Sequence, residues 1–156
     1  MFCKLISSPS NRTVPLLIAG VDPSLLKPPV NVLRLSLHPA GLAPRIANLA
    51  EWRSHLLTRL RRQIDVSADQ VLAELLNELS GYPITTGKKY DPQTSMDYAG
   101  VAVPFRVVTE GGILSFLSTT TVFGTPVDIT LSELALESFF PADAVTANAL
   151  RRLLSK

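Results

Sequence analysis

Leu33-Arg-Leu-Ser-Leu-His-Pro-Ala-Gly-Leu-Ala-Pro-Arg-Ile-Ala-Asn-Leu-Ala-Glu-Trp52 joins two patterns of regular structure within one short stretch. Over Val32 to Leu37, leucines alternate with polar residues, as they do in a strand with one buried face. The segment from His38 to Gly41 interrupts this alternation. From about Ala43 to Ile64, apolar residues recur at steps of three and four, and Pro44 suits the first turn of a helix. We therefore predict a strand followed by a long amphipathic helix.

A second helix is predicted directly after the first. Ser67 and Gln70 have the spacing of a capping box, and apolar residues continue at helical steps to Leu79. Gly81, which is soon followed by a proline, is a typical helix stop. From Tyr82 to Gly100 the sequence turns polar and has no period, which predicts a mobile loop.

Beyond this loop the sequence becomes rich in Val, Phe and Thr, which favour strands. Apolar residues alternate from Val101 to Val107, and Glu110-Gly111-Gly112 offers a hairpin turn. The stretch from Ile113 to Phe123 is expected to return as an antiparallel strand.

A third strand and a closing helix are predicted after Phe123. Gly124-Thr125-Pro126 indicates a turn, and alternation resumes from Val127 to Leu131. Pro141 is expected to open a C-terminal helix, with Asp143 in its first turn, where a negative charge is favourable. The order of elements predicts an α+β fold in which helices pack on one face of an antiparallel sheet.

Composition places the chain among single globular domains. Its 156 residues are 46% hydrophobic and 18% charged, so the chain can bury a core without disulfides or metal, and disorder is not expected. A formal net charge of +2 is too small to indicate nucleic-acid binding. Arg53, Arg59, Arg61 and Arg62 gather on the first long helix, where we expect a solvated face, with a phosphate or partner surface as the alternative.

Catalysis and metal binding find little support in the sequence. His38 and His55 are the only histidines, and neither lies in a cluster with metal-ligand spacing. The single cysteine, Cys3, cannot form an internal disulfide and indicates a reducing, cytoplasmic setting. The apolar run from Val14 to Ala19 is too short for a signal peptide or a membrane span. We expect no enzyme, no cofactor, no metal ion and no membrane association.

Three stretches carry a resemblance to a known family. They are Leu33 to Trp52, Thr119-Thr-Thr-Val-Phe-Gly-Thr-Pro126 and Glu137-Ser-Phe-Phe-Pro-Ala-Asp143. They resemble the ligand-binding domain of MmyB-like helix-turn-helix transcription regulators, and the likeness covers roughly Asn11 to Leu153. Family members begin this domain with a strand, and residues 1–10 differ from its sequence. We expect that this difference reflects a truncated or split gene product.

The resemblance implies a PAS-like fold that encloses a small, fatty-acid-like ligand. It also implies a DNA-binding helical domain ahead of this region, for which the chain has no room. We therefore expect that residues 11–156 form a PAS-like ligand-binding domain and that this chain alone does not bind DNA specifically.

Candidate ligand-binding residues cluster on the first long helix. Arg45, Asn48, Trp52 and His55 fall at steps of three and four and should share one flank. Arg45 offers an anionic head group a planar fork of donors; alternatively, it ties the turn that begins at His38 to the sheet. Trp52 suits a pocket wall and the core equally well. His38 either satisfies its turn or borders the pocket, where its titration would make binding depend on pH.

The apolar part of the pocket is expected between this helix and the inner side of the sheet. Thr119 is a strand former whose hydroxyl, if it points inward, needs a partner that a ligand or water could supply. The predicted ligand-contacting residues are Leu35, Leu37, His38, Arg45, Asn48, Trp52, Phe105, Phe116, Leu117, Thr119 and Phe123.

The sequence, together with the resemblance, predicts a ligand-sensing domain of a bacterial transcription regulator that binds a small apolar or fatty-acid-like molecule. The alternative is a non-sensing interaction module that forms homodimers, or heterodimers with a full-length regulator. In that case side chains would fill the space of the pocket.

Overall fold

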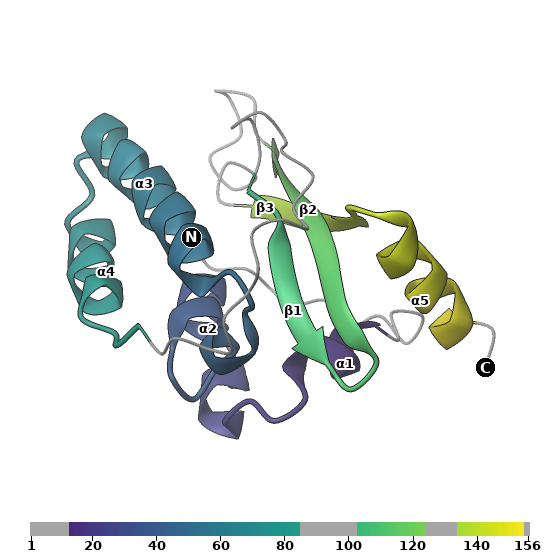
Figure 1. Cartoon of the computed structure of the whole chain (residues 1–156). Coiled ribbons are helices and arrows are strands. Elements are labelled where there is room, and N and C mark those ends of the chain that lie inside the picture. The colour runs from purple at the N-terminus through teal and green to yellow at the C-terminus, as the bar shows by residue number, and fades with distance from the viewer. Residues whose placement is uncertain (1–12, 85–102, 124–133, 155–156) are drawn as a thin grey trace.

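A three-stranded antiparallel sheet and the helices packed around it make up the computed structural model, which describes residues 13–84, 103–123 and 134–154 (Figure 1). Across the sheet the strands follow the order β1-β2-β3. The predicted α+β fold is confirmed. The elements are α1 (Thr13–Ile18), the 3-10 helix η1 (Pro23–Leu26), α2 (Val32–Leu37), the 3-10 helix η2 (Ala43–Arg45), α3 (Leu49–Ser67), α4 (Gln70–Ser80), β1 (Phe105–Thr109), β2 (Gly112–Phe123), β3 (Leu134–Pro141) and α5 (Ala144–Leu154).

The prediction of a strand over Val32 to Leu37 is wrong, because these residues form helix α2. The side chain of Asn31 caps this helix by accepting hydrogen bonds from the backbone N–H groups of Leu33 (3.0 Å) and Arg34 (3.1 Å). Such a cap satisfies N–H groups that have no partner within the helix. Six residues are too few to separate a period of two from a period of 3.6, so the cap was the more informative signal.

Gly41 allows the chain to leave α2 in a tight turn. Its own N–H donates to the carbonyl of His38, and the N–H of Leu42 donates to the carbonyl of Leu35, both at 2.8 Å. A Cβ atom at position 41 would lie 2.3 Å from the Leu35 carbonyl oxygen, much closer than van der Waals contact allows. Only glycine therefore fits this turn without a backbone shift.

The long helix exists, but it begins later than predicted. Residues 43–45 form the 3-10 turn η2, Ile46 makes an antiparallel bridge to Val107, and the N–H of Ala47 donates to the carbonyl of Arg106 at 2.9 Å. Helix α3 starts only at Leu49. The apolar spacing continues across this break because both the turn and the helix bury residues in the same core.

Helix α4 confirms the second predicted helix, although its cap differs from the predicted one. Asp69, not Ser67, is the N-cap, and its side chain accepts from the N–H of Val71 at 2.8 Å. Ser67 instead ends α3, and Ala68 adopts a left-handed conformation between the two helices. The stop at Gly81 is confirmed. Of the predicted mobile loop, only residues 82–84 belong to the described part of the chain.

The sheet confirms the predicted hairpin. β1 and β2 pair antiparallel, from Phe105 opposite Phe116 to Thr109 opposite Gly112. β2 and β3 pair antiparallel from Phe116 opposite Pro141 to Phe123 opposite Leu134. The predicted turn at 124–126 and the predicted alternating strand at 127–131 lie outside the described residues.

Pro141 ends β3 and does not open a helix, which corrects the prediction for the C-terminus. The side chain of Asp143 accepts from the N–H of Thr146 at 2.7 Å, so it caps the first turn of α5. The buried hydroxyl of Thr146 in turn accepts from the N–H of Ser115 at 2.9 Å, which attaches α5 to β2.

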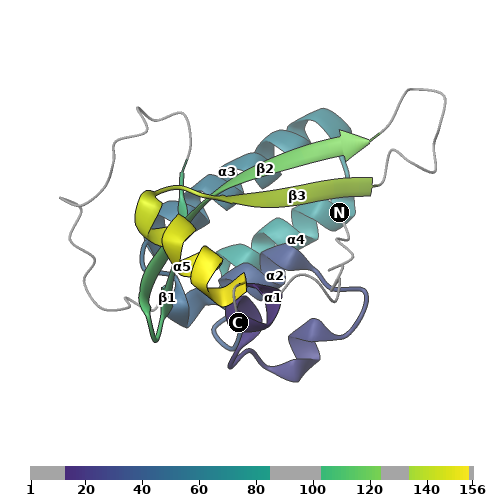
Figure 2. The same ribbon diagram turned by 90° about the vertical axis from the view of Figure 1, so that its right-hand side faces the viewer.

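Figure 1 and Figure 2 show how the helices pack around the sheet. α2, α3 and α4 lie along β1, whereas α5 lies beside β2 and β3, where Ala149 and Leu150 pack against the same hydrophobic core. We call the sheet surface toward α3 the inner face; its buried residues are Phe105, Val107, Leu114 and Phe116.

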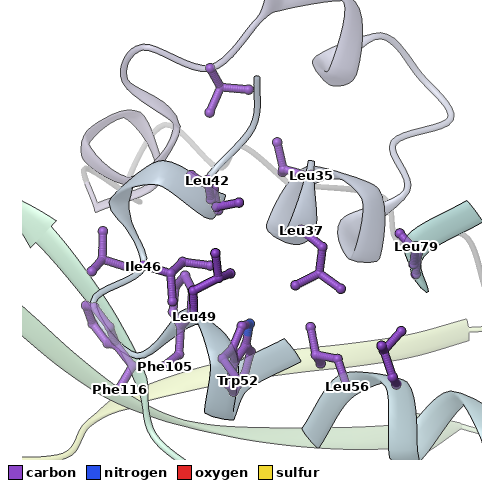
Figure 3. Close-up of a cluster of buried hydrophobic side chains, with 14 of the residues drawn as sticks. Leu35, Leu37, Leu42, Ile46, Leu49, Trp52, Leu56, Leu79, Phe105 and Phe116 are labelled. Atoms are coloured by element: carbon purple, nitrogen blue, oxygen red, sulfur yellow. The ribbon is translucent and has the colours of Figure 1, made fainter. Parts of the chain in front are cut away.

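The hydrophobic core fills the space between the inner face and these helices. Figure 3 shows side chains from α2, α3, α4 and the sheet converging on it. The labelled members are Leu35, Leu37, Leu42, Ile46, Leu49, Trp52, Leu56, Leu79, Phe105 and Phe116.

Candidate ligand-binding site

A chain of ring contacts runs from α3 across the inner face of the sheet. The ring of His55 stacks on Trp52 at a centroid distance of 5.7 Å and an interplanar angle of 26°. Trp52 contacts Phe105 at 5.0 Å, and Phe105 contacts Phe139 at 5.8 Å. Phe139 meets Phe116 edge to face at 6.4 Å. We call these five residues the aromatic row. Their spacings are those of favourable aromatic pairs.

The aromatic row opens toward solvent at Phe139. Trp52, Phe105 and Phe116 are at most 3% exposed, whereas Phe139 is 41% exposed even though its ring contacts two of them. Phe139 shares the inner face with Phe116 because it stands opposite Ser118, two residues along β2. The rings of Trp52, Phe105 and Phe116 are therefore buried, and the row is accessible to solvent at Phe139 of β3.

Trp52 joins α3 to α2. Its indole N–H donates to the hydroxyl of Ser36 at 2.9 Å, and both residues are buried. Leu35 and Leu37 flank Ser36 in α2 and belong to the same core (Figure 3). The structure thus brings together five of the predicted apolar residues: Leu35, Leu37, Trp52, Phe105 and Phe116.

Arg45 lies in η2, not on the flank of the long helix where the sequence placed it. Its Nη1 donates to the carbonyls of Leu17 (3.0 Å) and Ala19 (2.7 Å), and its Nη2 donates to Leu16 (3.2 Å). Its Nε donates to the carbonyl of Val108 at 3.3 Å. The guanidinium therefore binds the C-terminal carbonyls of α1 and joins that helix to β1.

Asn48 is buried and fully engaged with the backbone near β1. Its amide nitrogen donates to the carbonyl of Pro104 at 2.9 Å and to the carboxylate of Glu51 at 2.8 Å. Its side-chain oxygen accepts from the N–H of Arg106 at 3.3 Å. Asn48 thus fixes the start of α3 against the sheet.

His38 satisfies its own turn and contacts a polar cluster on the protein surface. Its Nδ1 accepts from the N–H of Ala40 at 3.0 Å, and its ring meets Tyr82 edge to face at 5.0 Å. The hydroxyl of Tyr82 donates to Glu78, which also pairs with Arg34 at 2.7 Å. The hydrogen bond from Arg34 lowers the pKa of Glu78. Burial, and then the bond to Glu78, raises the pKa of Tyr82 to about 12.

Leu117 and Thr119 lie on the face opposite Phe116, because successive residues of β2 alternate between the faces. Leu117 is half-buried and Thr119 is exposed. The structure therefore does not place these two beside the aromatic row. The backbone of Phe123 pairs with Leu134 at the end of β2, and its side chain lies outside the described part.

Sequence reasoning named the flank of α3 but missed how far it extends. Arg59 and Arg62 continue the steps of three and four that run through Trp52 and His55. Burial lowers the pKa of His55, and the positive charges of Arg59 and Arg62 lower it further. The same spacing could have identified these residues. Arg53 is different, because its guanidinium donates to the carbonyls of Leu79 and Ser80 at the end of α4.

The described residues hold neither a metal-binding group nor a membrane-spanning helix. Within ranges 13–84, 103–123 and 134–154, no three His, Cys, Asp or Glu side chains form a group that could hold a metal ion. No helix in these ranges combines the length and the apolar character that crossing a bilayer requires.

The family of the chain follows from a model that matches nearly its whole length. The model for the MmyB-like transcription regulator ligand binding domain matches residues 9–153. The chain belongs to this family. The apolar interior of this MmyB-like domain is therefore that of a ligand-binding domain from a class of transcription regulators. No curated protein and no solved structure matched the chain.

Proposed function

We propose that this MmyB-like domain senses a small apolar or fatty-acid-like molecule that binds at the exposed Phe139 of the aromatic row. Ligand sites in proteins are lined mainly by apolar and aromatic side chains, with a few polar groups that fix orientation. Phe139 supplies an exposed aromatic group on a strand of the sheet, next to the buried rings of Phe105 and Phe116. No chemistry on the ligand is proposed.

The observation that carries this proposal is the exposure of Phe139. A phenylalanine that is 41% exposed leaves apolar surface in water, although its ring neighbours Phe105 and Phe116 are buried. A ligand that covers Phe139 would remove this surface from water at roughly 25 cal/mol per Å².

Phe139 and Phe140 provide a matched pair for testing the proposal. They are adjacent in β3 and similarly exposed, but Phe140 stands opposite Leu117 and so lies on the other face. Trp52 is the single tryptophan of the chain, so its fluorescence reports on the aromatic row. Titration with dodecanoate and dodecanol should show saturable changes in this fluorescence.

Phe139→Ala should weaken both probes about five- to tenfold, the loss expected for one aromatic contact of about 1 kcal/mol. Phe140→Ala should leave their affinities unchanged. Native mass spectrometry of the purified protein should also show a co-purifying amphiphile. Equal effects of the two substitutions, or no binding of either probe, would contradict the sensing proposal.

An interaction module remains the second candidate function because of residues outside the inner face. Val108 and Ile113, which are paired across β1 and β2, are 44% and 41% exposed, and Phe140 is 53% exposed. Such side chains suit contact with another protein. Analytical ultracentrifugation would support this candidate if Ile113→Lys dissociated a dimer without changing probe binding.

A further inference from the structure

We propose that His38 is a proton-driven conformational switch. Its neutral imidazole holds the turn that follows α2, and its protonated imidazole moves toward the carboxylates of Asp22 and Glu78. The switch makes the junction between α2, α4 and the segment around η1 respond to pH. This response goes beyond the sensing of an apolar ligand, because it does not involve the aromatic row.

The neutral state is defined by one hydrogen bond within the turn. The N–H of Ala40 donates to Nδ1 of His38 at 3.0 Å. A neutral imidazole has one nitrogen that can accept such a bond, whereas both nitrogens of an imidazolium are donors. Protonation of Nδ1 would therefore leave two N–H groups facing each other. The bond exists only in the neutral ring, which must carry its proton on Nε2.

Ala40 connects this turn to the segment that leads into η1. While its N–H is bound by His38, its carbonyl accepts from the N–H of Asp22 at 2.9 Å. The side chain of Asp22 in turn caps η1 by accepting from the N–H of Ser24 at 2.8 Å. A bond that fixes Ala40 thus also supports the position of Asp22, so its loss should be felt beyond the turn itself.

Two carboxylates favour the protonated state. The hydrogen bonds from Ser24 lower the pKa of Asp22, and the positive charge of His38 lowers it further. The hydrogen bond from Arg34 lowers the pKa of Glu78, and the charge of His38 again acts in the same sense. Opposite charges within reach stabilise each other's ionised forms, so both carboxylates attract an imidazolium at position 38.

The other charged and titratable groups of this region leave the two carboxylates able to act. Arg34 pairs with Glu78 at 2.7 Å and neutralises part of its charge, and Lys27 acts in the same way on Asp22. The ring of Tyr82 meets His38 edge to face, and its hydroxyl stays neutral because burial and the bond to Glu78 raise its pKa to about 12.

The contacts of His38 therefore oppose each other. The backbone of its own turn favours the neutral ring, whereas the side chains before η1 and on α4 favour the charged ring. Imidazoles change their charge between about pH 5 and 8. A change of pH across this range would exchange one set of contacts for the other without unfolding the domain.

The test uses nuclear magnetic resonance of the 15N-labelled full chain at about pH 8 and about pH 5, where imidazoles are mainly neutral and mainly charged. At the higher pH, the 15N shifts of His38 should show a proton on Nε2, and a scalar coupling through the hydrogen bond should join Nδ1 to the amide nitrogen of Ala40. At the lower pH this coupling should disappear. The resonances of Asp22 and Tyr82 should shift with the same midpoint as His38.

His38→Asn is the matched control, because an asparagine side chain can accept from the N–H two residues later but does not titrate. In this variant the shifts of Asp22 and Tyr82 with pH should be lost. His55, the second histidine, is an internal reference whose titration should leave Ala40 unaffected. A proton on Nδ1 at the higher pH, a coupling that persists at the lower pH, or the same pH response in His38→Asn would overturn the proposal.

Discussion

Arg45→Ala tests whether this guanidinium stabilises the fold. The substitution removes four hydrogen bonds to backbone carbonyls, two of them, to Leu16 and Leu17, in partly buried positions. If each partly buried bond contributes about 1 kcal/mol and each exposed bond about half as much, the loss is about 3 kcal/mol. For a domain of this size, that loss lowers the melting temperature by about 6–12 °C.

Thermal unfolding followed by circular dichroism measures this shift. Arg61→Ala is the control, because an exposed arginine should change stability by no more than about 0.5 kcal/mol. Arg45→Lys keeps the charge but loses the planar fork, so it should fall between the wild type and Arg45→Ala. A melting temperature of Arg45→Ala equal to that of the control would refute the structural role. Selective loss of dodecanoate affinity without a change in melting temperature would instead support the head-group role that the sequence suggested for Arg45.

Three further perturbations test other parts of the structure. Gly41→Ala should lower the free energy of unfolding in urea by about 2–4 kcal/mol, because the new Cβ would lie 2.3 Å from the Leu35 carbonyl oxygen. Gly111→Ala is the control and should be nearly neutral, because the nearest atom to its Cβ is 3.9 Å away. Equal losses of stability in the two variants would show that the turn at Gly41 can relax. Burial and the bond to Glu78 raise the pKa of Tyr82 to about 12, so the stability that its neutral form contributes is present below about pH 10 and is lost as the pH rises toward 12. The difference in phenolate absorbance between wild type and Tyr82→Phe should therefore titrate near pH 12. A titration step near pH 10 would contradict the burial of Tyr82 and its contact with Glu78. Burial lowers the pKa of His55, so on acidification the imidazole is protonated in the unfolded chain before it is protonated in the folded domain. Stability should therefore fall as the pH drops below about 6.5, and His55→Gln should reduce this fall. An unchanged pH dependence in His55→Gln would argue against burial of the imidazole.

Sequence patterns predicted well those elements whose signals extend over many residues. Helix α4, its stop at Gly81 and the β1–β2 hairpin follow from long apolar periods and from specific turn residues. The six residues of α2 were mispredicted because their alternation is compatible with either structure, and the capping group at Asn31 lies just outside the pattern. The secondary structure of a short segment therefore depends more on its capping residues and tertiary contacts than on the period of its apolar residues.

The apolar and polar parts of the candidate site differed in predictability. Leu35, Trp52 and Phe105 could be anticipated because buried residues must converge on one core. The facing of Leu117 and Phe139 depends on strand register, which the apolar residues on both faces of β2 and β3 leave open. Arg45 illustrates a further limit, because its partners are backbone carbonyls that have no sequence signature.

The segment that carries Arg45, Ile46 and Ala47 has a consequence for association. In β1, the backbone groups of Arg106 and Val108 point away from β2, where an incoming strand could use them. The N–H of Arg106 is bonded to Asn48, its carbonyl to Ala47, and the carbonyl of Val108 to Arg45. Exposed strand edges with free backbone groups invite pairing with other chains and aggregation. These backbone groups at the β1 edge are thus already hydrogen-bonded within the domain. Two copies of the domain could not pair through β1 without first breaking these bonds.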